Sequence, residues 1–335
     1  MNNSPIIAEN LVRHFGDVHA VKGIDLEVKA GEVFGFLGPN GAGKSTAVRM
    51  LTTLLRPTSG TARVAGFDVV KQADQVRRNI GVALQDAAID PLMTGAELLA
   101  LQAVLYGIPS SALKKRSDEL LERVGLTAAA SRRVSTYSGG MRRRLDLALS
   151  LIHQPTVLFL DEPTTGLDPM SRLTLWEEVR RLNREGTTVM LTTQYLEEAD
   201  QLADRIAIID HGKIVREGKP ADLKASVGAP TLIINTNMDQ AEKANAVLST
   251  FGDLRPGAEG ALGVGLRGGA SQVTEVVRKL DEAGVHVQHL EINEPSLDDV
   301  FAEATGYRLE GADNAPSAGD NDDEEPKKKK RRGRK

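Results

Sequence analysis

A glycine-rich segment after an apolar run constrains this chain more than any other feature. Residues 33–37 are apolar and predict a buried strand, and residues 43–45 read Gly-Lys-Ser, separated from Gly38 by four residues. This is the spacing of a phosphate-binding loop. Residues 47–51 read Ala-Val-Arg-Met-Leu and predict a helix directly after the loop. The segment therefore predicts a strand–loop–helix unit that holds a triphosphate.

The residue types in this loop suit a phosphate group. The glycines lack a Cβ, so the backbone can curl until its N–H groups point toward an anion. Lys44 can place its charge near the β- and γ-phosphates, and Ser45 can offer its hydroxyl to Mg²⁺. The expected binding residues are Gly38, Pro39, Asn40, Gly41, Ala42, Gly43, Lys44, Ser45 and Thr46. The alternative is a glycine-rich turn with a chance lysine, and the flanking strand and helix argue against it.

A second apolar run, at residues 157–160, ends in Asp161 and Glu162. Two adjacent carboxylates at the end of a buried strand are costly unless a cation or water chemistry uses them. Asp161 is suited to hold Mg²⁺ through water. Glu162 points differently, so it can orient and polarise a water aimed at the γ-phosphate. The alternative is a pair of N-cap residues for the next helix.

A third segment, Tyr-Ser-Gly-Gly-Met at residues 137–141, precedes apolar residues at helical spacing. Ser138 is a good N-cap residue. The segment Ser138-Gly139-Gly140 therefore predicts a second helix N-terminus with bare backbone, where a phosphate could bind. A plain capped helix is the alternative, and the segment taken alone favours it. The arginines at 142–144 are expected to face solvent at least in part.

Two single residues are candidates because of where they stand. Phe15 lies in a turn predicted between two strands of residues 6–28, and it could stack on an adenine ring or be ordinary strand core. Gln194 follows the β-branched run 187–193. If the sheet is parallel, this run lies beside the strand that carries Asp161. From there the amide of Gln194 could sense the γ-phosphate by hydrogen bonding.

The charge balance is uneven along the chain. The 42 basic and 46 acidic residues give a net charge of −4, but eight of the basic residues lie at 327–335, and without them the balance is −12. An acidic body argues against a nucleic-acid partner. The chain has no cysteine, which excludes disulfides and thiolate chemistry. It also lacks an apolar run of membrane-spanning length, so we expect any membrane role to be peripheral.

The pattern divides the chain into three parts. Residues 1–221 carry every motif above, with a helical insert at about 90–150. Residues 222–307 predict a small α/β domain without a chemical motif, after a break in the pattern at 221–230. Residues 308–335, first acidic and then basic, predict a disordered tail.

The phosphate loop, the 137–141 segment and Leu-Phe-Leu-Asp-Glu-Pro at 158–163 resemble, in order and separation, the ATP-binding subunits of ABC transporters. Gln85 is similar to the family's glutamine loop, Phe15 to its adenine-stacking aromatic residue, and Asp168 to its D-loop aspartate. The resemblance covers roughly residues 6–220. The segments 192–200 and 294–301, together with the extra domain, resemble the daunorubicin-resistance-type exporters.

This resemblance implies an α/β fold: an ABC-type P-loop NTPase domain with a mixed core sheet, an antiparallel β subdomain and a helical subdomain. The cofactors would be ATP and Mg²⁺, with Ser45, Gln85 and Asp161 at the metal. Two copies would pair head to tail, so that Ser138 and Gly140 meet the γ-phosphate of ATP held by the other copy. The segment around 90–135, with Gln85, would dock on a separate membrane permease.

The sequence departs from the family at two positions. Met141 stands where glutamine is usual in the signature segment, and Gln194 stands where the switch residue is usually histidine. A glutamine amide can donate a hydrogen bond to the γ-phosphate but cannot carry a proton or a charge. The resemblance therefore implies an ATPase with Lys44, Glu162 and Gln194 in catalysis, and with hydrolysis slow or tuned.

The function implied is export of a drug or antibiotic, from the cytoplasmic face of the cell membrane. The alternative is a soluble ABC-type ATPase that acts on ribosomes or DNA. Such proteins tend to carry two ATP modules or a long coiled coil, and this chain has one phosphate loop and no heptad arm. A nucleotide-binding regulator without hydrolysis is disfavoured by Glu162. The basic tail is a candidate for binding anionic lipid.

Overall fold

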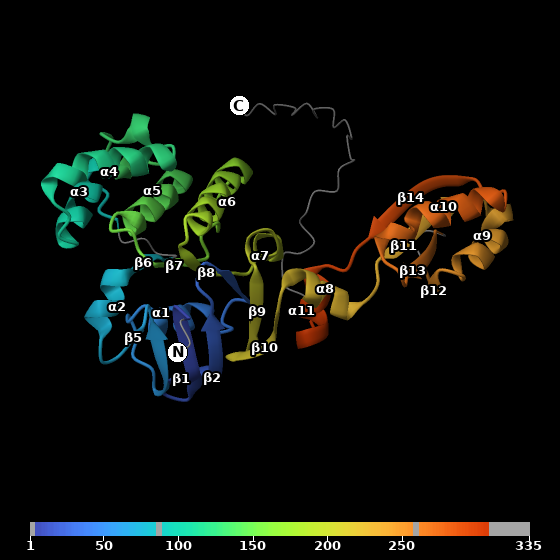
Figure 1. Cartoon of the computed structure of the whole chain (residues 1–335), viewed down its shortest axis with the longest axis horizontal. Helices are drawn as coiled ribbons and strands as arrows, with labels where there is room; N and C mark the ends of the chain where they lie inside the picture. The colour runs from blue at the N-terminus through green and yellow to red at the C-terminus, as the bar shows by residue number, and fades with distance from the viewer. Residues whose placement is uncertain (1–3, 85–88, 257–260, 308–335) are drawn as a thin grey trace, which may run out of the picture.

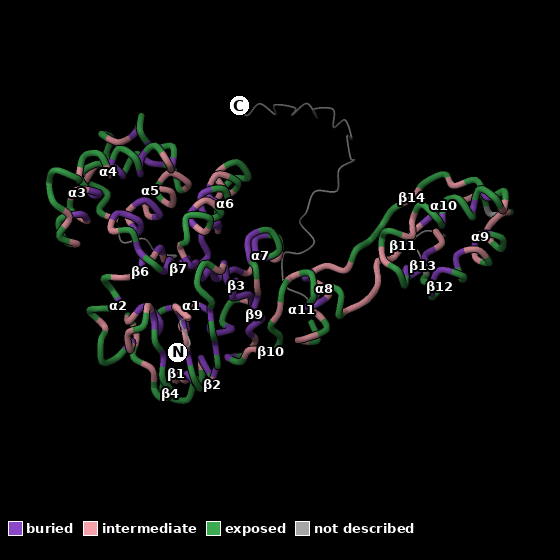
Figure 2. The backbone as a smooth tube through the Cα atoms, viewed as in Figure 1, coloured by how far each residue is buried: buried purple, intermediate pink, exposed green. Residues whose placement is uncertain are grey.

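The computed structural model describes residues 4–84, 89–256 and 261–307. A large N-terminal α/β domain lies beside a small C-terminal domain, and two chain segments join them (Figure 1). Buried residues concentrate on the strands at the centre of the large domain (Figure 2). No helix in the described part of the chain is long and apolar enough to cross a bilayer.

A six-stranded mixed sheet forms the centre of the large domain. In spatial order its strands are β10 (Lys213–Gly218), β9 (Arg205–Asp210), β3 (Val33–Leu37), β8 (Thr188–Thr193), β7 (Val157–Asp161) and β6 (Ile80–Ala83). All neighbours are parallel except β9 and β10, which form a hairpin. Its two turn residues, His211 and Gly212, have φ values of 45° and 81°. Positive φ at both positions is what a type I′ turn requires.

An antiparallel sheet packs on one side of this centre. Its strands, in spatial order, are β2 (Val18–Val28), β1 (Ile6–Phe15), β4 (Ser59–Val64) and β5 (Phe67–Asp68). Helix α1 (Lys44–Leu51) shares one core with both sheets, because its Val48 and Leu51 are buried in the same cluster as Phe34 of β3 and Ile6 of β1. Helix α2 (Ala73–Asn79), which the sequence pattern did not predict, leads into β6.

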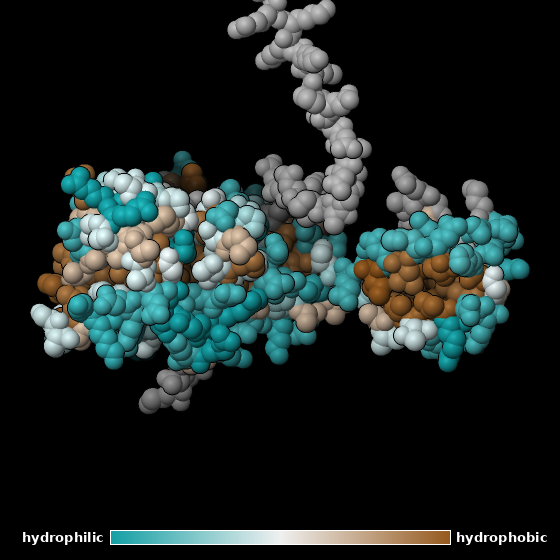
Figure 3. Space-filling model, turned by 90° about the horizontal axis from the view of Figure 1, so that it is seen from above, coloured by the Kyte–Doolittle hydropathy of each residue, from teal (hydrophilic) through white to brown (hydrophobic). Residues whose placement is uncertain are grey.

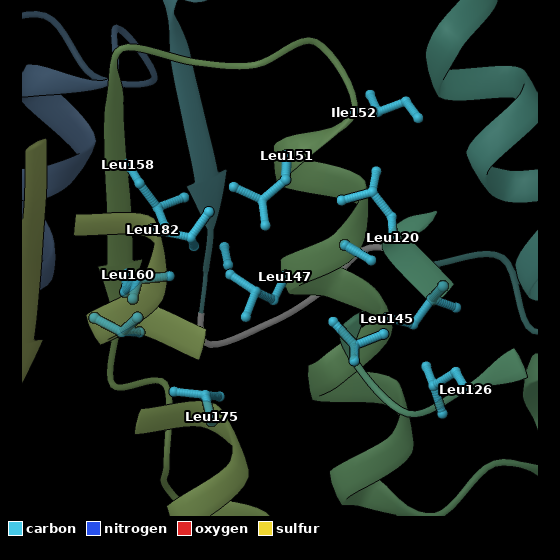
Figure 4. Packing of buried hydrophobic residues seen from close by; sticks show 14 of the residues in the cluster. Leu120, Leu126, Leu145, Leu147, Leu151, Ile152, Leu158, Leu160, Leu175 and Leu182 are labelled. Atoms are coloured by element: carbon cyan, nitrogen blue, oxygen red, sulfur yellow. The ribbon is translucent and has the colours of Figure 1, made fainter. Parts of the chain in front are cut away.

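The helical subdomain packs on the other side. Its helices are α3 (Gly95–Leu105), α4 (Ser110–Arg123) and α5 (Gly139–Leu151), and α6 (Pro169–Arg184) follows β7. In Figure 4, Leu147 and Leu151 of α5 lie on the side of β7, while Leu145 lies on the side of Leu126. Because one helix buries apolar side chains in both directions, α5 ties the helical subdomain to the central sheet.

The small domain is a four-stranded antiparallel sheet with two helices. Its elements are β11 (Thr231–Thr236), α9 (Ala241–Leu248), β12 (Gly252–Pro256), β13 (Leu262–Leu266), α10 (Val273–Glu282) and β14 (Val287–Asn293). The strand order is β12-β13-β11-β14, which is the split β-α-β arrangement of ferredoxin-like units. Both helices share a core with alternate strand residues, so they cover the same face of the sheet. From above, this domain presents a band of apolar side chains between polar borders (Figure 3).

The segments that flank the small domain pack against the large one. Helix α8 (Pro220–Val227) leaves the large domain, and helix α11 (Leu297–Thr305) returns to it, beside α7 (Leu196–Leu202). Phe301 and Val300 of α11 share a buried cluster with Leu223 of α8 and Leu37 of β3. The sequence pattern places a break between the two domains at 221–230, and α8 occupies the first part of this stretch; Pro220 starts α8 at a position that tolerates proline.

Candidate active site

The phosphate loop leaves β3 at the carboxyl edge of the sheet. The N–H of Gly38 donates to Thr193 O of β8 at 3.3 Å. A Cβ on Gly38 would lie 2.3 Å from Ile209 O, and one on Gly43 would lie 2.4 Å from Ala20 O. Gly43 also has a φ of 109° and caps α1. Close packing and backbone conformation therefore require glycine at both positions.

Lys44 is the first residue of α1, and its side chain crosses the loop. It is 4% exposed, and its Nζ donates to Gly38 O at 2.8 Å and to Pro39 O at 3.0 Å. The same Nζ lies 3.3 Å from Glu162 Oε1. Burial lowers the pKa of Lys44, while the charges of Glu162 and Asp161 oppose that change. The ammonium is thus held where the loop and the end of β7 meet.

Asp161, the last residue of β7, accepts hydrogen bonds from hydroxyl groups of two other segments. Ser45 Oγ donates to Asp161 Oδ1 at 3.1 Å, and Thr192 Oγ1 of β8 donates to the same oxygen at 2.5 Å. A carboxylate beside a serine hydroxyl is a hard oxygen pair of the kind that Mg²⁺ accepts together with phosphate oxygens. The described residues contain no cluster of three or more metal-binding side chains. The pair therefore fits a metal that a nucleotide also ligates.

Glu162 follows in an unusual backbone conformation. Its φ is 48°, which is uncommon for a residue other than glycine and is often found at functional sites. Its N–H donates to both the carbonyl and the hydroxyl oxygen of Thr192, each at 3.1 Å. Thr165 Oγ1 donates to Oε2 of the carboxylate at 3.4 Å. The carboxylate is therefore held between Thr165 and Lys44.

Gln194 lies directly after β8, and β8 separates β3 from β7 in the sheet. The pairing of Leu37 with Thr193 and of Asp161 with Thr192 aligns the ends of the three strands. The parallel arrangement expected from the sequence is therefore present. The side chain of Gln194 is partly exposed at this edge.

The second glycine segment lies with Asp168 rather than with the phosphate loop. Ser138 caps α5 and accepts a hydrogen bond from Met141 N at 3.2 Å. A Cβ on Gly140 would lie 2.9 Å from Ser171 Oγ, which donates to Asp168 Oδ2 at 2.6 Å. The hydrogen bonds from Ser171 lower the pKa of Asp168. Within the described ranges, no hydrogen bond joins residues 138–140 to the phosphate loop.

Two further candidates stand apart from this group. Phe15 ends β1 and is 46% exposed, with the guanidinium carbon of Arg13 4.4 Å from its ring centroid. The alternative that Phe15 is strand core is therefore wrong. Gln85 lies outside the described residues.

Sequence reasoning missed two residues that shape the site. Thr192 was part of a β-branched run that predicts only a buried strand, yet its hydroxyl binds Asp161 and the N–H of Glu162. Arg143 was expected on a partly solvated face, yet its guanidinium donates to Glu162 O at 2.7 Å. The run of arginines gives no signal of which side chain turns inward.

A buried lysine on a glycine loop, facing two carboxylates at the end of a nearby parallel strand, defines a P-loop nucleoside triphosphatase. A family model described as ABC transporter matches residues 21–165. A second model, described as the C-terminal domain of DrrA1-3-like ATP-binding proteins, matches residues 218–305.

Comparison with known proteins gives full-length relatives. The daunorubicin resistance ATP-binding protein DrrA2 of Streptomyces coeruleorubidus is 45% identical over 322 residues, which is 95% of this chain and 100% of that protein. The daunorubicin/doxorubicin resistance ATP-binding protein DrrA of Streptomyces peucetius is 46% identical over 317 residues, 92% of this chain and 95% of that protein. A solved dimeric ATP-binding cassette, bound to ADP and Pi after hydrolysis, matches with a TM-score of 0.59 and 26% identity, over 64% of this chain and 98% of that one.

The chain therefore belongs to the ATP-binding proteins of ABC transporters, in the branch of the daunorubicin-resistance ATP-binding proteins. It binds and hydrolyses ATP as a subunit of such a transporter. The fold and family that the sequence predicts are confirmed, and the ribosome- or DNA-acting alternative is not favoured.

Proposed function

We propose that this chain powers the export of a drug or antibiotic through a separate membrane permease. The observation that carries the proposal is the alignment of a daunorubicin-resistance protein along 95% of the chain, together with the match of the accessory domain to the C-terminal domain of such proteins. A pull-down from a detergent extract tests it. Recovery of a polytopic membrane protein supports the proposal, and recovery of ribosomes without a membrane protein contradicts it.

The site residues have separate roles in ATP hydrolysis. The loop N–H groups and the N-terminus of α1 bind the phosphates, and Lys44 places its charge on the β- and γ-phosphates. Ser45 and Asp161 would hold Mg²⁺, which would neutralise charge on the phosphate oxygens. Glu162 orients and polarises the attacking water, and Gln194 donates to the γ-phosphate. Phe15, exposed at the end of β1, stacks on the adenine ring.

Two copies of the chain close the site head to tail. The N-cap Ser138 and the following Gly139 are exposed and do not bind their own phosphate loop, which supports a role toward the nucleotide of a second copy. Asp168 lies near this segment, because its hydrogen-bond partner Ser171 lies beside Gly140. In this arrangement each ATP is held between the loop of one copy and the α5 N-terminus of the other.

The absence of cysteine makes this pairing directly testable. Asn40→Cys and Gly139→Cys place thiols on an exposed loop residue and on a glycine with open space around its Cβ position. We expect a disulfide between a copy with one change and a copy with the other, formed only with ATP. Lys115→Cys, whose side chain is 84% exposed, is the control and should not cross-link. Equal cross-linking of the control contradicts the pairing.

The permease docks on the helical subdomain. A groove of about 340 Å³ lies between β6, α3 and α5, and its lining includes Leu54, Gln102 and Asp146. Leu54 is 58% exposed, so Leu54→Asp should weaken recovery of the permease while the ATPase rate of the isolated protein is kept. Val215→Asp changes an exposed residue of β10 on the other edge of the sheet and is the control. Unchanged recovery with Leu54→Asp contradicts this docking site.

The accessory domain steadies the dimer or the membrane complex and adds no chemistry. Thr231 pairs with Asn293 across β11 and β14, so a short linker can replace residues 231–293 and leave α8 and α11 in place. This deletion should keep ATP binding and weaken assembly with the permease. Loss of ATP binding in a folded deletion variant contradicts the assignment.

The protein acts at the cytoplasmic face of the membrane as a peripheral subunit. The basic residues 327–335, outside the described residues, support a contact with anionic lipid, at about 1 kcal/mol per cationic side chain as an upper limit. The acidic residues at 322–325 cancel part of this. Sedimentation with anionic liposomes at low salt, with and without residues 326–335, tests the contact, and equal binding contradicts it.

A further inference from the structure

The guanidinium of Arg143 binds the backbone on which the site is built. Arg143 projects from α5, and its Nε donates to Pro163 O at 3.2 Å. Its Nη2 donates to Glu162 O at 2.7 Å and to Asp161 O at 3.3 Å. Its Nη1 donates to Leu84 O, one residue after β6. One side chain thus joins α5 to the segments that follow two neighbouring strands of the central sheet.

The backbone that Arg143 holds is in a conformation that needs support. Glu162 has a φ of 48°, which L-residues other than glycine seldom adopt. Thr192 binds the N–H of Glu162, and Arg143 binds its carbonyl oxygen. These bonds hold the peptide groups on both sides of the Glu162 Cα. A change in either peptide rotates the carboxylate away from its place 3.3 Å from Lys44 Nζ.

We propose that Arg143 is a positioning residue for ATP hydrolysis: it fixes the backbone of Glu162 so that the carboxylate faces the reacting phosphate. It does so from α5, the helix that Ser138 caps. Arg143 therefore links the glycine segment at the start of α5 to the general base of the same chain. Arginine suits this role because its five donors are spread over three nitrogens of a rigid plane and can reach carbonyls that lie apart, whereas the three donors of an ammonium sit on one nitrogen.

The effect should fall on turnover and spare nucleotide affinity. The carbonyls that Arg143 holds belong to residues 161–163 and Leu84, and the phosphate loop is built on β3 and α1. A misplacement of about 1 Å in a reacting group lowers turnover about 100-fold. We therefore expect Arg143→Ala to lower kcat by about that factor, with the ATP Kd changed by less than about threefold.

The next residue in the chain provides a matched control. Arg144 also donates from α5 to a carbonyl, at 2.8 Å from Nη1 to Val124 O after α4. Its side chain is partly buried, as is that of Arg143, but its bond leads to the helical subdomain and not to β7. Arg144→Ala removes a bond of the same kind. It should lower the melting temperature and leave kcat within about twofold below that temperature.

The experiment compares the full-length parent with Arg143→Ala, Arg143→Lys and Arg144→Ala. Steady-state ATPase rates give kcat, equilibrium titration gives the ATP Kd, and thermal unfolding shows that each variant is folded. Arg143→Lys keeps a cation but should not restore the parental kcat, and it carries the test if Arg143→Ala does not fold. A parental kcat in the Arg143 variants, or an equal loss of kcat in Arg144→Ala, overturns the proposal.

A double variant separates positioning from general damage. If Arg143 acts through the carboxylate of Glu162, Arg143→Ala should cause little further loss of single-turnover rate in a Glu162→Gln background. A full additional loss of about 100-fold in that background overturns the proposal, because the arginine would then act independently of the base.

Discussion

Asp146 on α5 is a partly buried carboxylate whose removal should stabilise the protein in a pH-dependent manner. Its Oδ2 has no hydrogen-bond partner among the described residues, and burial raises the pKa of Asp146 to about 7, against the opposing charge of Arg143. The folded protein therefore keeps a proton that the unfolded chain releases above pH 4. Consequently stability falls as the pH rises from about 4 to 7, and Asp146→Asn removes this loss.

The size of the effect follows from the pKa. Because each pKa unit corresponds to about 1.4 kcal/mol, the gain from Asp146→Asn should grow by about 2 to 3 kcal/mol between pH 5 and pH 8. This is an upper limit, since the side chain keeps some contact with water. Burying the asparagine amide of Asp146→Asn also has a cost, but this cost does not depend on pH and changes the gain in stability by the same amount at every pH. His153 lines the same groove as Asp146, and burial lowers the pKa of His153. Because the parent and Asp146→Asn both contain His153, its contribution to stability cancels in the difference between them.

Trp176 provides the assay. It is the single tryptophan of the chain, and it is buried in the core cluster that includes α5. Urea unfolding followed by its fluorescence, at pH 5, 6, 7 and 8, gives the free energy of unfolding of the parent and Asp146→Asn. A difference between the two proteins that does not change with pH would refute the reasoning, because Asp146 would then ionise as it does in the unfolded chain.

Changes at three further positions have expected outcomes. Lys44→Ala should weaken ATP binding at least about 10-fold in calorimetric titration, since it removes the cation on the phosphates; unchanged affinity contradicts this. Gln194→Ala should lower the ATPase rate by about 10- to 1000-fold. Because glutamine does not titrate, Gln194 should add no pH dependence to the parental ATPase rate between pH 6 and 8, whereas Gln194→His should add such a dependence. Phe301→Ala should lower stability by about 3 to 5 kcal/mol and expose α11 to limited proteolysis, because Phe301 is fully buried; unchanged cleavage contradicts the packing of α11.

Local motifs made the centre of the site predictable from sequence. The phosphate loop is specified by glycines whose Cβ positions are blocked or whose φ is positive, as at Gly38 and Gly43. The carboxyl ends of parallel strands share one edge of a sheet, so the loop and the Asp161-Glu162 pair were expected to meet. The contact between Lys44 and Glu162 shows that they do.

Long-range packing accounts for what the sequence could not predict. The apolar residues of α11 indicate a helix, but the same stripe could pack on the accessory domain or, as it does, on α8 and α7. The arginines at 142–144 are chemically identical, and only the position of α5 against β7 brings Arg143 to the carbonyl of Glu162. The short helix α8 begins with Pro220 and ends before Gly228, two residue types that both predict a break.

Hydrolysis depends on Glu162 as the base that activates water beside Lys44, and one measurement tests this role most directly. The ATPase rate, the ATP Kd and the oligomeric state of Glu162→Gln are compared with those of the parent, in the presence of Mg²⁺ and ATP. We predict that hydrolysis falls at least about 100-fold, because the amide cannot accept the proton. ATP should still bind, and a nucleotide-bound dimer should accumulate in size-exclusion chromatography with light scattering. Hydrolysis at the parental rate by folded Glu162→Gln would contradict the account.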